Sequence, residues 1–185
     1  ARDERGAIEH VDTLQHGRFQ ADLYVDCTGF RAELIGRAPG AEFHSVRRHL
    51  FADRALTCKL PVDGAEAAME SCTIATAHEA GWTWEIGLNG SRGVGVVYSS
   101  DHMSDDRAAQ ILRACVGPGH AEAATRRIPF AAGWRRKQWV RNCVAVGLSA
   151  GFLEPLAAPG LVLIEAAVGM IAEMFPHGGP IEAPA

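Results

Sequence analysis

The chain has 185 residues, of which 48% are hydrophobic and 22% charged, and its formal net charge is −4. This composition is typical of one or two small globular domains and excludes an intrinsically disordered chain. The negative net charge gives no general attraction to nucleic acid or acidic lipid. Five cysteines without a C-x-x-C spacing indicate a reducing compartment, so we expect a cytoplasmic protein.

The first predicted elements are two strands of a hairpin that ends in a glycine turn. Residues 7–14 and 19–26 have the pattern of strands, with a turn at His16 and Gly17. The second strand runs into Cys27-Thr28-Gly29, and such a strand end in an open α/β sheet commonly meets a ligand. From the residues alone, an ordinary glycine turn is an equal alternative. Residues 31–50 predict a loop with a short helix.

The middle of the chain predicts an antiparallel sheet. We expect three or four strands, the last two joined as a hairpin, over residues 54–60, 71–77, 81–88 and 94–98. Because side chains alternate along a strand, Trp82, Trp84 and Ile86 lie on one face and Thr83 and Glu85 on the other. The residues alone favour an aromatic core face for a half-buried sheet.

A helix is expected next, over residues 101–116. Ser104 is its predicted N-cap, and Asp105 and Asp106 fall in the first turn, where carboxylates complement the helix dipole. A Gly-Pro-Gly sequence at residues 117–119 ends it. The apolar residues on one side of this helix are Ala108, Ile111, Leu112 and Cys115.

Residues 126–141 form a basic run that includes Trp134 and Trp139. Basic residues with aromatic ones can bind single-stranded nucleic acid. The net charge is negative and no RNA-binding motif is present, so we favour a solvated hairpin edge and expect no nucleic-acid partner. The eight histidines have no metal-ligand spacing, so we predict no metal site.

The stretch between Arg141 and Glu165 carries one charged residue, Glu154. It predicts a strand over residues 139–146, a glycine-bearing loop, and a helix from about residue 159 to residue 175. Charge, prolines and glycines inside the stretch disfavour a membrane span. A helix N-terminus that faces a glycine-lined loop can receive flavin or phosphate oxygens. A buried strand and helix without a ligand is an equal alternative.

Four segments resemble, in order and spacing, the flavin-dependent tryptophan halogenases. Residues 21–31 are similar to a strand that ends in an Asp-Cys-Thr/Ser-Gly-Phe turn. Residues 81–86 are similar to the Trp-x-Trp-x-Ile-Pro signature, and residues 97–106 to the sequence after this signature. Residues 142–156 are similar to the second flavin-contacting segment. The resemblance implies an α/β (α+β) chain: a partial FAD-dependent monooxygenase-type fold with a mixed or antiparallel sheet on the substrate side.

The same resemblance implies how the chain is divided. Residues 1–35 are expected to be part of a FAD-binding domain, and residues 36–140 a sheet-rich region on the substrate side. Residues 141–176 are then the strand, loop and helix that return to the FAD-binding domain. The last residues, 177–185, are expected to be a loose tail.

Site residues are carried over from the family position by position. The resemblance implies that Trp82, Trp84 and Ile86 form a wall that keeps substrate off the flavin and disfavours direct oxygenation. The backbone of Gly160 is the implied halide contact. The implied FAD contacts are Thr28, Gly29, Leu148, Gly160 and Leu161.

The chain departs from the family at its catalytic positions. Ala157 stands where the family has a catalytic Glu, and Pro159 replaces a Thr that helps to hold the halide, so no catalytic residue is assigned. No Gly-x-Gly-x-x-Gly follows a strand, because residues 93–95 lie inside the expected hairpin. Neither Lys59 nor Lys137 has the context of the family's catalytic Lys. We expect an internal fragment of a longer protein, and whether the fragment is an enzyme stays open.

The implied reaction starts from oxygen and reduced FAD, which a separate flavin reductase supplies. Halide is converted to hypohalous acid, which passes the wall and halogenates a small, electron-rich aromatic substrate. Two other interpretations compete: a degenerate, non-catalytic flavoprotein remnant, and a binding module that uses the basic, Trp-rich strip. We expect no membrane partner.

Overall fold

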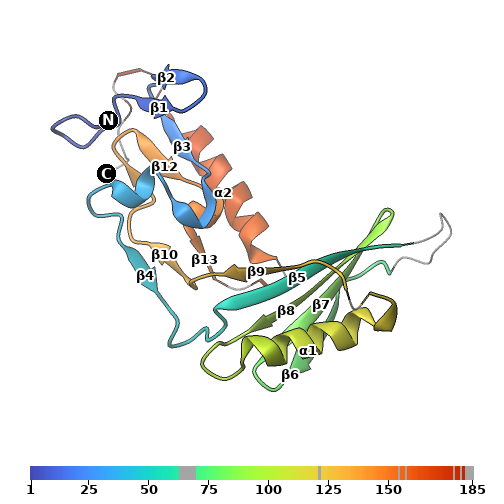
Figure 1. The fold of residues 1–185 in the computed structure, drawn as a ribbon. Helices are drawn as coiled ribbons and strands as arrows, with labels where there is room; N and C mark the ends of the chain where they lie inside the picture. Colours follow the sequence, from blue (N-terminus) through green and yellow to red (C-terminus); the bar gives the residue numbers. More distant parts are fainter. Residues whose placement is uncertain are drawn as a thin grey trace. The chain divides into compact units, whose positions relative to one another are not determined.

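The structure is a computed structural model that describes residues 1–62, 70–120, 122–153, 155–156, 158–176, 178–179 and 181. The chain forms two compact units (Figure 1). Unit 1 is made from Ala1–Val46 together with Ala132–Ala185, and unit 2 is the continuous stretch Arg47–Ala131. Which unit serves the flavin and which the substrate stays a prediction.

Unit 1 contains a short hairpin and a three-stranded sheet of mixed direction. The hairpin pairs β1 (Val11–Thr13) with β2 (Gly17–Phe19). In the sheet, β12 (Cys143–Ala145) lies in the centre. It is antiparallel to β11 (Trp139–Val140) and parallel to β3 (Tyr24–Asp26). Parallel pairing therefore joins two segments from opposite ends of the chain.

A second three-stranded sheet of unit 1 is antiparallel. Its central strand is β10 (Gly133–Arg135), which pairs with β4 (Phe43–Ser45) and β13 (Gly151–Phe152). The helical elements of this unit are the 3-10 turns η1 (Gly29–Arg31), η2 (Ile35–Arg37) and η4 (Gly147–Ser149), and the helix α2 (Pro159–Met174). The start predicted for α2 is confirmed, and its last residue lies next to the predicted end.

The core of unit 1 lies around the parallel strands and the η2 turn. Its larger members, Tyr24, Ile35 and Cys143, are almost fully buried. Burial raises the pKa of the Cys143 thiol to about 11. The other buried residues of this core are Ile8, Ala32, Ala38, Ala41 and Ala145.

The single strand predicted over residues 139–146 is wrong. β11 and β12 instead form a tight antiparallel pair. Between them Arg141 has a φ of 54°, in the left-handed region that non-glycine residues rarely adopt. Asn142 next to it accepts a hydrogen bond from the Ile8 N–H at 2.8 Å and donates one to the Ile8 carbonyl at 2.9 Å. This long-range pairing fixes the reversal of the chain.

The hairpin predicted for the N-terminal part is confirmed only in its first half. β2 ends at Phe19, and the residues expected to continue it form β3 in a different sheet. The Tyr24 N–H donates to the Asn142 carbonyl at 2.8 Å, so pairing with the C-terminal part of the chain replaces pairing within the hairpin.

Unit 2 is a five-stranded antiparallel sheet with a helix on one face. The strand order is β6-β7-β8-β5-β9. Figure 1 shows α1 (Asp105–Val116) lying across the sheet. The four predicted strands are found, with boundaries shifted by up to three residues. In chain order the strands are β5 (Arg54–Pro61), β6 (Ile74–His78), β7 (Gly81–Leu88), β8 (Ser91–Tyr98) and β9 (Thr125–Pro129).

The packed face of α1 is as predicted. The Ser104 hydroxyl accepts a hydrogen bond from the Arg107 N–H at 3.1 Å and caps the helix. Ala108, Ile111 and Leu112 are buried, and Cys115 packs against them. The helix begins at Asp105 rather than at residue 101. The rest of this core comes from Leu56, Cys58, Leu60, Val94, Val96, Tyr98, Met103 and Val116.

The aromatic side of β7 is not the core side of the sheet. Thr83 lies opposite Val96 of β8, and directly opposed residues of antiparallel strands share a face. Since Val96 belongs to the core that α1 covers, Trp82, Trp84 and Ile86 lie on the other face, which we call the tryptophan face. Their shared face is confirmed, but the expected aromatic core is wrong, because β8 supplies this core with valine and tyrosine.

The basic run does not form one hairpin edge. Residues 125–129 are the edge strand β9 of unit 2, and residues 133–135 are β10 of unit 1. Arg127 forms an ion pair with Asp105. Arg135 donates to the carbonyls of Ser149 at 2.8 Å and Ala41 at 2.9 Å. Two of the basic side chains thus hold the fold together.

Within the described ranges, no helix combines the length and apolar character that a membrane crossing needs. The described His, Cys, Asp and Glu residues form no group of three or more that could hold a metal ion. All five cysteines are free thiols, with Cys58 and Cys143 buried and Cys27 and Cys72 exposed. The expected tail at 177–185 lies mostly outside the described residues.

Candidate functional site

Two parallel strands of unit 1 end side by side in matching turns. Asp26 ends β3 and lies opposite Ala145, which ends β12. Each strand continues into a glycine with a left-handed φ, Gly29 at 71° and Gly147 at 70°, and this glycine opens a 3-10 turn. Glycine adopts this conformation without the crowding that a Cβ would cause. Because the strands are parallel, η1 and η4 lie at the same edge of the sheet, where α/β folds bind ligands.

The buried carboxylate of Asp26 organises the first turn. One oxygen accepts from the N–H and hydroxyl of Thr28, at 2.9 and 2.6 Å. The other accepts from the N–H groups of Leu34 and Ile35, at 3.0 and 2.8 Å. Burial alone would raise the pKa of Asp26, but these hydrogen bonds hold the pKa below its ordinary value of 3.8. Asp26 is therefore a buried anion at neutral pH.

Ser149 ties the two turns together. Its hydroxyl is hydrogen-bonded to the backbone carbonyl of Asp26 and lies 3.0 Å from the carbonyl of Val146. The Val146 N–H donates to the same Asp26 carbonyl at 3.1 Å. Ser149 and Asp26 are both almost fully buried. These bonds fix η1 and η4 relative to each other.

An apolar pocket of about 380 Å³ opens between η4, the strands β10 and β13, and α2. Leu148 and Gly160, two of the predicted FAD contacts, line it. A Cβ on Gly147 would lie 3.4 Å from Ile164 Cδ1, so α2 packs closely on η4. A Cβ on Gly160 would meet no atom within 4 Å, so the first turn of α2 borders open space. Backbone N–H groups in a first helical turn are available as donors.

The other predicted FAD contacts lie at different distances from this pocket. Gly29 borders open space, and the ring of the next residue, Phe30, packs edge to face on Phe152 of the pocket wall, with centroids 5.7 Å apart. Thr28 is close by in sequence. Leu161 is 69% exposed and is not among the residues that line the pocket. The structure therefore brings Gly29, Leu148 and Gly160 into one neighbourhood, with Thr28 next to Gly29, and Leu161 follows Gly160 without lining the pocket.

The side chain of Thr28 is engaged within its own turn. Its hydroxyl donates to Asp26 and accepts from the Glu33 N–H at 2.8 Å, and its backbone N–H also donates to Asp26. Thr28 therefore shapes the turn, and its role as a direct FAD contact stays a prediction.

The predicted wall lies in unit 2. Trp82 and Trp84 are half-buried on the tryptophan face, and Ile86 is 37% exposed. Their place between flavin and substrate stays a prediction, because the wall and the FAD contacts belong to different units. Ala157, at the family's Glu position, lies outside the described residues. After it, Ala158 has a left-handed φ of 50° and Pro159 is the first residue of α2, with no side-chain cap.

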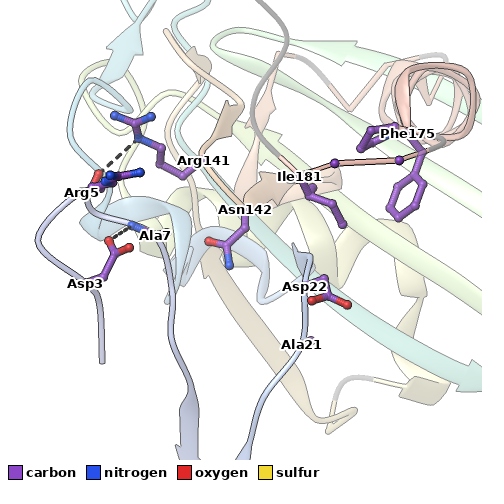
Figure 2. A pocket seen from close by; sticks show the side chains of 12 residues that line it. Asp3, Arg5, Ala7, Ala21, Asp22, Arg141, Asn142, Phe175 and Ile181 are labelled. Carbon is purple, nitrogen blue, oxygen red and sulfur yellow. Dashed lines mark hydrogen bonds between the residues drawn. The ribbon is translucent and has the colours of Figure 1, made fainter.

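A second pocket of unit 1 is lined by both charged and apolar side chains and contains none of the predicted site residues. Figure 2 shows Asp3, Arg5 and Arg141 on one side of it. Asp3 accepts from the Ala7 N–H at 2.7 Å, and the Arg141 guanidinium donates to the Arg5 carbonyl at 3.2 Å. The first bond closes a turn within the N-terminal segment, and the second fastens this segment to the turn after β11. We therefore do not place the candidate site here.

Sequence reasoning missed four residues that build the site: Asp26, Phe30, Ser149 and Phe152. A signal for the two phenylalanines was present, since each follows a glycine, Phe30 in the η1 turn and Phe152 in β13, the strand after η4. Asp26 and Ser149 act through bonds between distant segments. No local pattern in the sequence reports such bonds.

Comparisons with known proteins show which family the chain is similar to. The tryptophan halogenase family model matches residues 1–184. The chain is 42% identical over 174 residues to the 7-chloro-L-tryptophan 6-halogenase KtzR of Kutzneria sp. (strain 744), covering 94% of this chain and 34% of KtzR.

Solved structures show the same likeness. The tryptophan 6-halogenase SttH from Streptomyces toxytricini superposes with a TM-score of 0.91 at 42% identity, over 96% of this chain and 35% of SttH. Tar14, a flavin-dependent tryptophan C-6 halogenase from taromycin biosynthesis, gives a TM-score of 0.91 at 45% identity, over 97% of this chain and 36% of Tar14.

The chain thus spans about a third of the length of the relatives it matches. The match covers nearly all of its own residues, in both sequence and fold. Its mixed α/β architecture is that of a partial FAD-dependent monooxygenase-type fold. The chain belongs to the tryptophan halogenase family.

Proposed function

We propose that the chain is the flavin-contacting part of a longer FAD-dependent halogenase, which halogenates a small, electron-rich aromatic substrate through hypohalous acid. A separate reductase would supply reduced FAD, and the cytoplasm is the proposed location. One observation carries the proposal: two parallel strands, far apart in sequence, end in matching glycine turns beside an apolar pocket at the start of a helix.

The residues present fit one edge of a flavin. The pocket is lined mainly by apolar side chains, which suit an aromatic ring system. Gly29 and Gly160 both border open space, so a ligand could approach their backbone closely. FAD would supply the oxidation chemistry when bound. The chain's own part is to place the ring edge at Leu148 and to offer the Gly160 backbone to halide.

The proposal is tested by thiol labelling of Cys27, which lies next to Thr28 and is exposed. We expect reduced or oxidised FAD to slow alkylation of Cys27 by iodoacetamide, measured by mass spectrometry of the digested chain. Cys72, exposed in unit 2, is the internal control and should react at an unchanged rate. A Leu148→Asp variant should lose the protection.

Two results would count against flavin binding. One is a Cys27 rate that does not change at any FAD concentration up to the solubility limit. The other is equal protection of Cys27 and Cys72, which would indicate that FAD quenches the reagent. We also expect well below one FAD per chain to survive gel filtration, because no dinucleotide-binding Gly-x-Gly-x-x-Gly is present.

A non-catalytic flavoprotein is the second candidate, and the sequence at the family's catalytic position favours it. Ala157 cannot act as an acid or base, and loss of such a group commonly lowers the rate on the order of a hundredfold or more. The test is halogenation by the product of the complete gene, with reduced FAD, chloride or bromide, and indole substrates. Turnover would exclude the non-catalytic protein.

A further inference from the structure

Strand β8 carries two glycines, Gly93 and Gly95, in the middle of a regular sheet. Every residue of β8 pairs with both β7 and β5. Neither glycine has a φ in the left-handed region. A glycine inside a strand lowers stability and often marks the close approach of another group. Backbone conformation gives no reason for these glycines, so the close approach of another group is the remaining explanation.

The approaching group is the indole of Trp84. Trp84 lies directly opposite Gly95. A Cβ on Gly95 would lie 2.5 Å from Cε2, 2.6 Å from Nε1 and 2.7 Å from Cζ2 of this ring. A Cβ on Gly93 would lie 3.1 Å from Cζ3 and 3.6 Å from Cη2. One ring system therefore occupies the space that two side chains of β8 would fill.

We propose that Gly93 and Gly95 are positioning residues that form a slot for the Trp84 indole on the tryptophan face. The inference rests on the proposed function, in which Trp84 belongs to the wall between flavin and substrate. The indole reaches across the neighbouring strand and lies close to its backbone, so the position of this part of the wall depends on β8. Alanine at residue 95 forces the ring to move, whereas alanine at residue 93 requires a shift of only a few tenths of an ångström.

The test is a double-mutant cycle on the whole 185-residue chain, followed by urea unfolding with far-UV circular dichroism. Gly95→Ala should lower the unfolding midpoint, and Gly93→Ala should lower it less. In a Trp84→Ala background the same glycine substitutions should no longer lower the midpoint, because the clashing ring is gone. Gly119→Ala is the control, since a Cβ there meets no atom within 4 Å.

A second readout reports on the ring itself. Gly95→Ala should increase acrylamide quenching of the tryptophan fluorescence, and this increase should be absent when Trp84 is alanine. A destabilisation that persists in the Trp84→Ala background would overturn the proposal, and so would unchanged quenching. If Gly95→Ala does not fold, a folded Gly95→Ala/Trp84→Ala double variant supports the slot and an unfolded one refutes it. The cycle needs no flavin or halide, so its failure is separate from failure of the Cys27 test.

Discussion

Asp26 is the residue on which the two turns of unit 1 depend. It is fully buried, and its carboxylate receives four hydrogen bonds, while its backbone carbonyl receives the Val146 N–H and contacts the Ser149 hydroxyl. A carboxylate is needed here because both oxygens must act as acceptors. The residue is thus a structural anion that holds the η1 turn in place and joins it to η4.

Asp26→Asn should destabilise the chain. The NH2 group of the asparagine amide faces N–H groups that need an acceptor. These N–H groups are left without a hydrogen bond, which lowers the free energy of unfolding by about 1–3 kcal/mol. Urea unfolding at neutral pH measures this loss. The Cys27 thiol, one residue further along, should also be alkylated faster. Asp22→Asn, at an exposed position of the same segment, should leave both quantities unchanged.

Asp105 is the corresponding residue of unit 2. Its carboxylate accepts from the Tyr98 hydroxyl at 2.8 Å and pairs with Arg54 and Arg127. These contacts hold the pKa of Asp105 at about 2. Burial and the bond to Asp105 raise the pKa of Tyr98 to about 12, so the phenol stays a donor at physiological pH. The first turn of α1 is thereby fastened to β5, β8 and β9.

We expect this network to make the free energy of unfolding depend on pH in the acidic range. A carboxyl group whose pKa is lower in the folded state stabilises the fold above the unfolded pKa, here 3.8, and the contribution is lost as the pH falls through the folded value of about 2. The urea midpoint should therefore drop between about pH 4 and pH 2. Asp105→Asn should remove this part of the pH dependence. Asp106→Asn, one residue along and exposed, should retain it.

At the scale of elements, local patterns predicted four of the five strands of unit 2 and its helix α1, and failed where distant segments meet. The alternation from Trp82 to Ile86 is local, and the predicted bounds of β7 are those of the structure. The turn at Arg141 is not local, because it depends on Asn142 bonding to Ile8. The local sequence does not show that Asn142 bonds to a residue 134 positions away.

The sequence pattern also did not show which face of the unit 2 sheet is covered by a helix. Alternation showed that Trp82, Trp84 and Ile86 share a face, but it did not show which face α1 covers. The covering helix selects the face of Val94, Val96 and Tyr98. The tryptophans look like core residues by their hydrophobicity alone. The glycine turns of the candidate site could be predicted from the sequence, but the hydrogen bonds that support these turns could not.

Both the sequence and the structure identify Ser104 as the N-cap of α1. Ser104→Ala removes the side-chain acceptor of the Arg107 N–H and should lower the free energy of unfolding by about 0.5–2 kcal/mol. Ser104→Thr retains a hydroxyl and should restore most of that loss. Urea unfolding measures both. Equal destabilisation by alanine and threonine would show that the cap contributes nothing.

On the scale of the whole molecule, α2 has more apolar surface than a solvent-exposed helix normally shows. None of its described residues is buried, and Leu161, Val162, Val168 and Met170 are each more than half exposed. A helix that is apolar on all sides is usually a buried one. Exposed patches of this kind promote association.

We therefore expect the 185-residue chain to self-associate. Its weight-average mass in sedimentation equilibrium should rise with concentration. A Val162→Lys/Val168→Lys variant, which spares the pocket lining, should remain monomeric over the same range. Leu14→Lys is the matched control, because Leu14 is fully exposed in the β1–β2 hairpin and should leave the association unchanged. A mass independent of concentration would contradict the prediction.

Unit 2 interrupts unit 1, and the two ends of the interruption lie close together. Unit 2 leaves unit 1 after Val46 and returns at Ala132, and the Val46 N–H donates to the Ala132 carbonyl at 3.0 Å. β4 and β10, which flank the break, are neighbours in one sheet. A cassette with closely spaced ends can be exchanged for another of different length while the host sheet keeps its register. The fold thus permits the tryptophan-bearing sheet to be replaced as a module, independently of the turns that would hold the flavin.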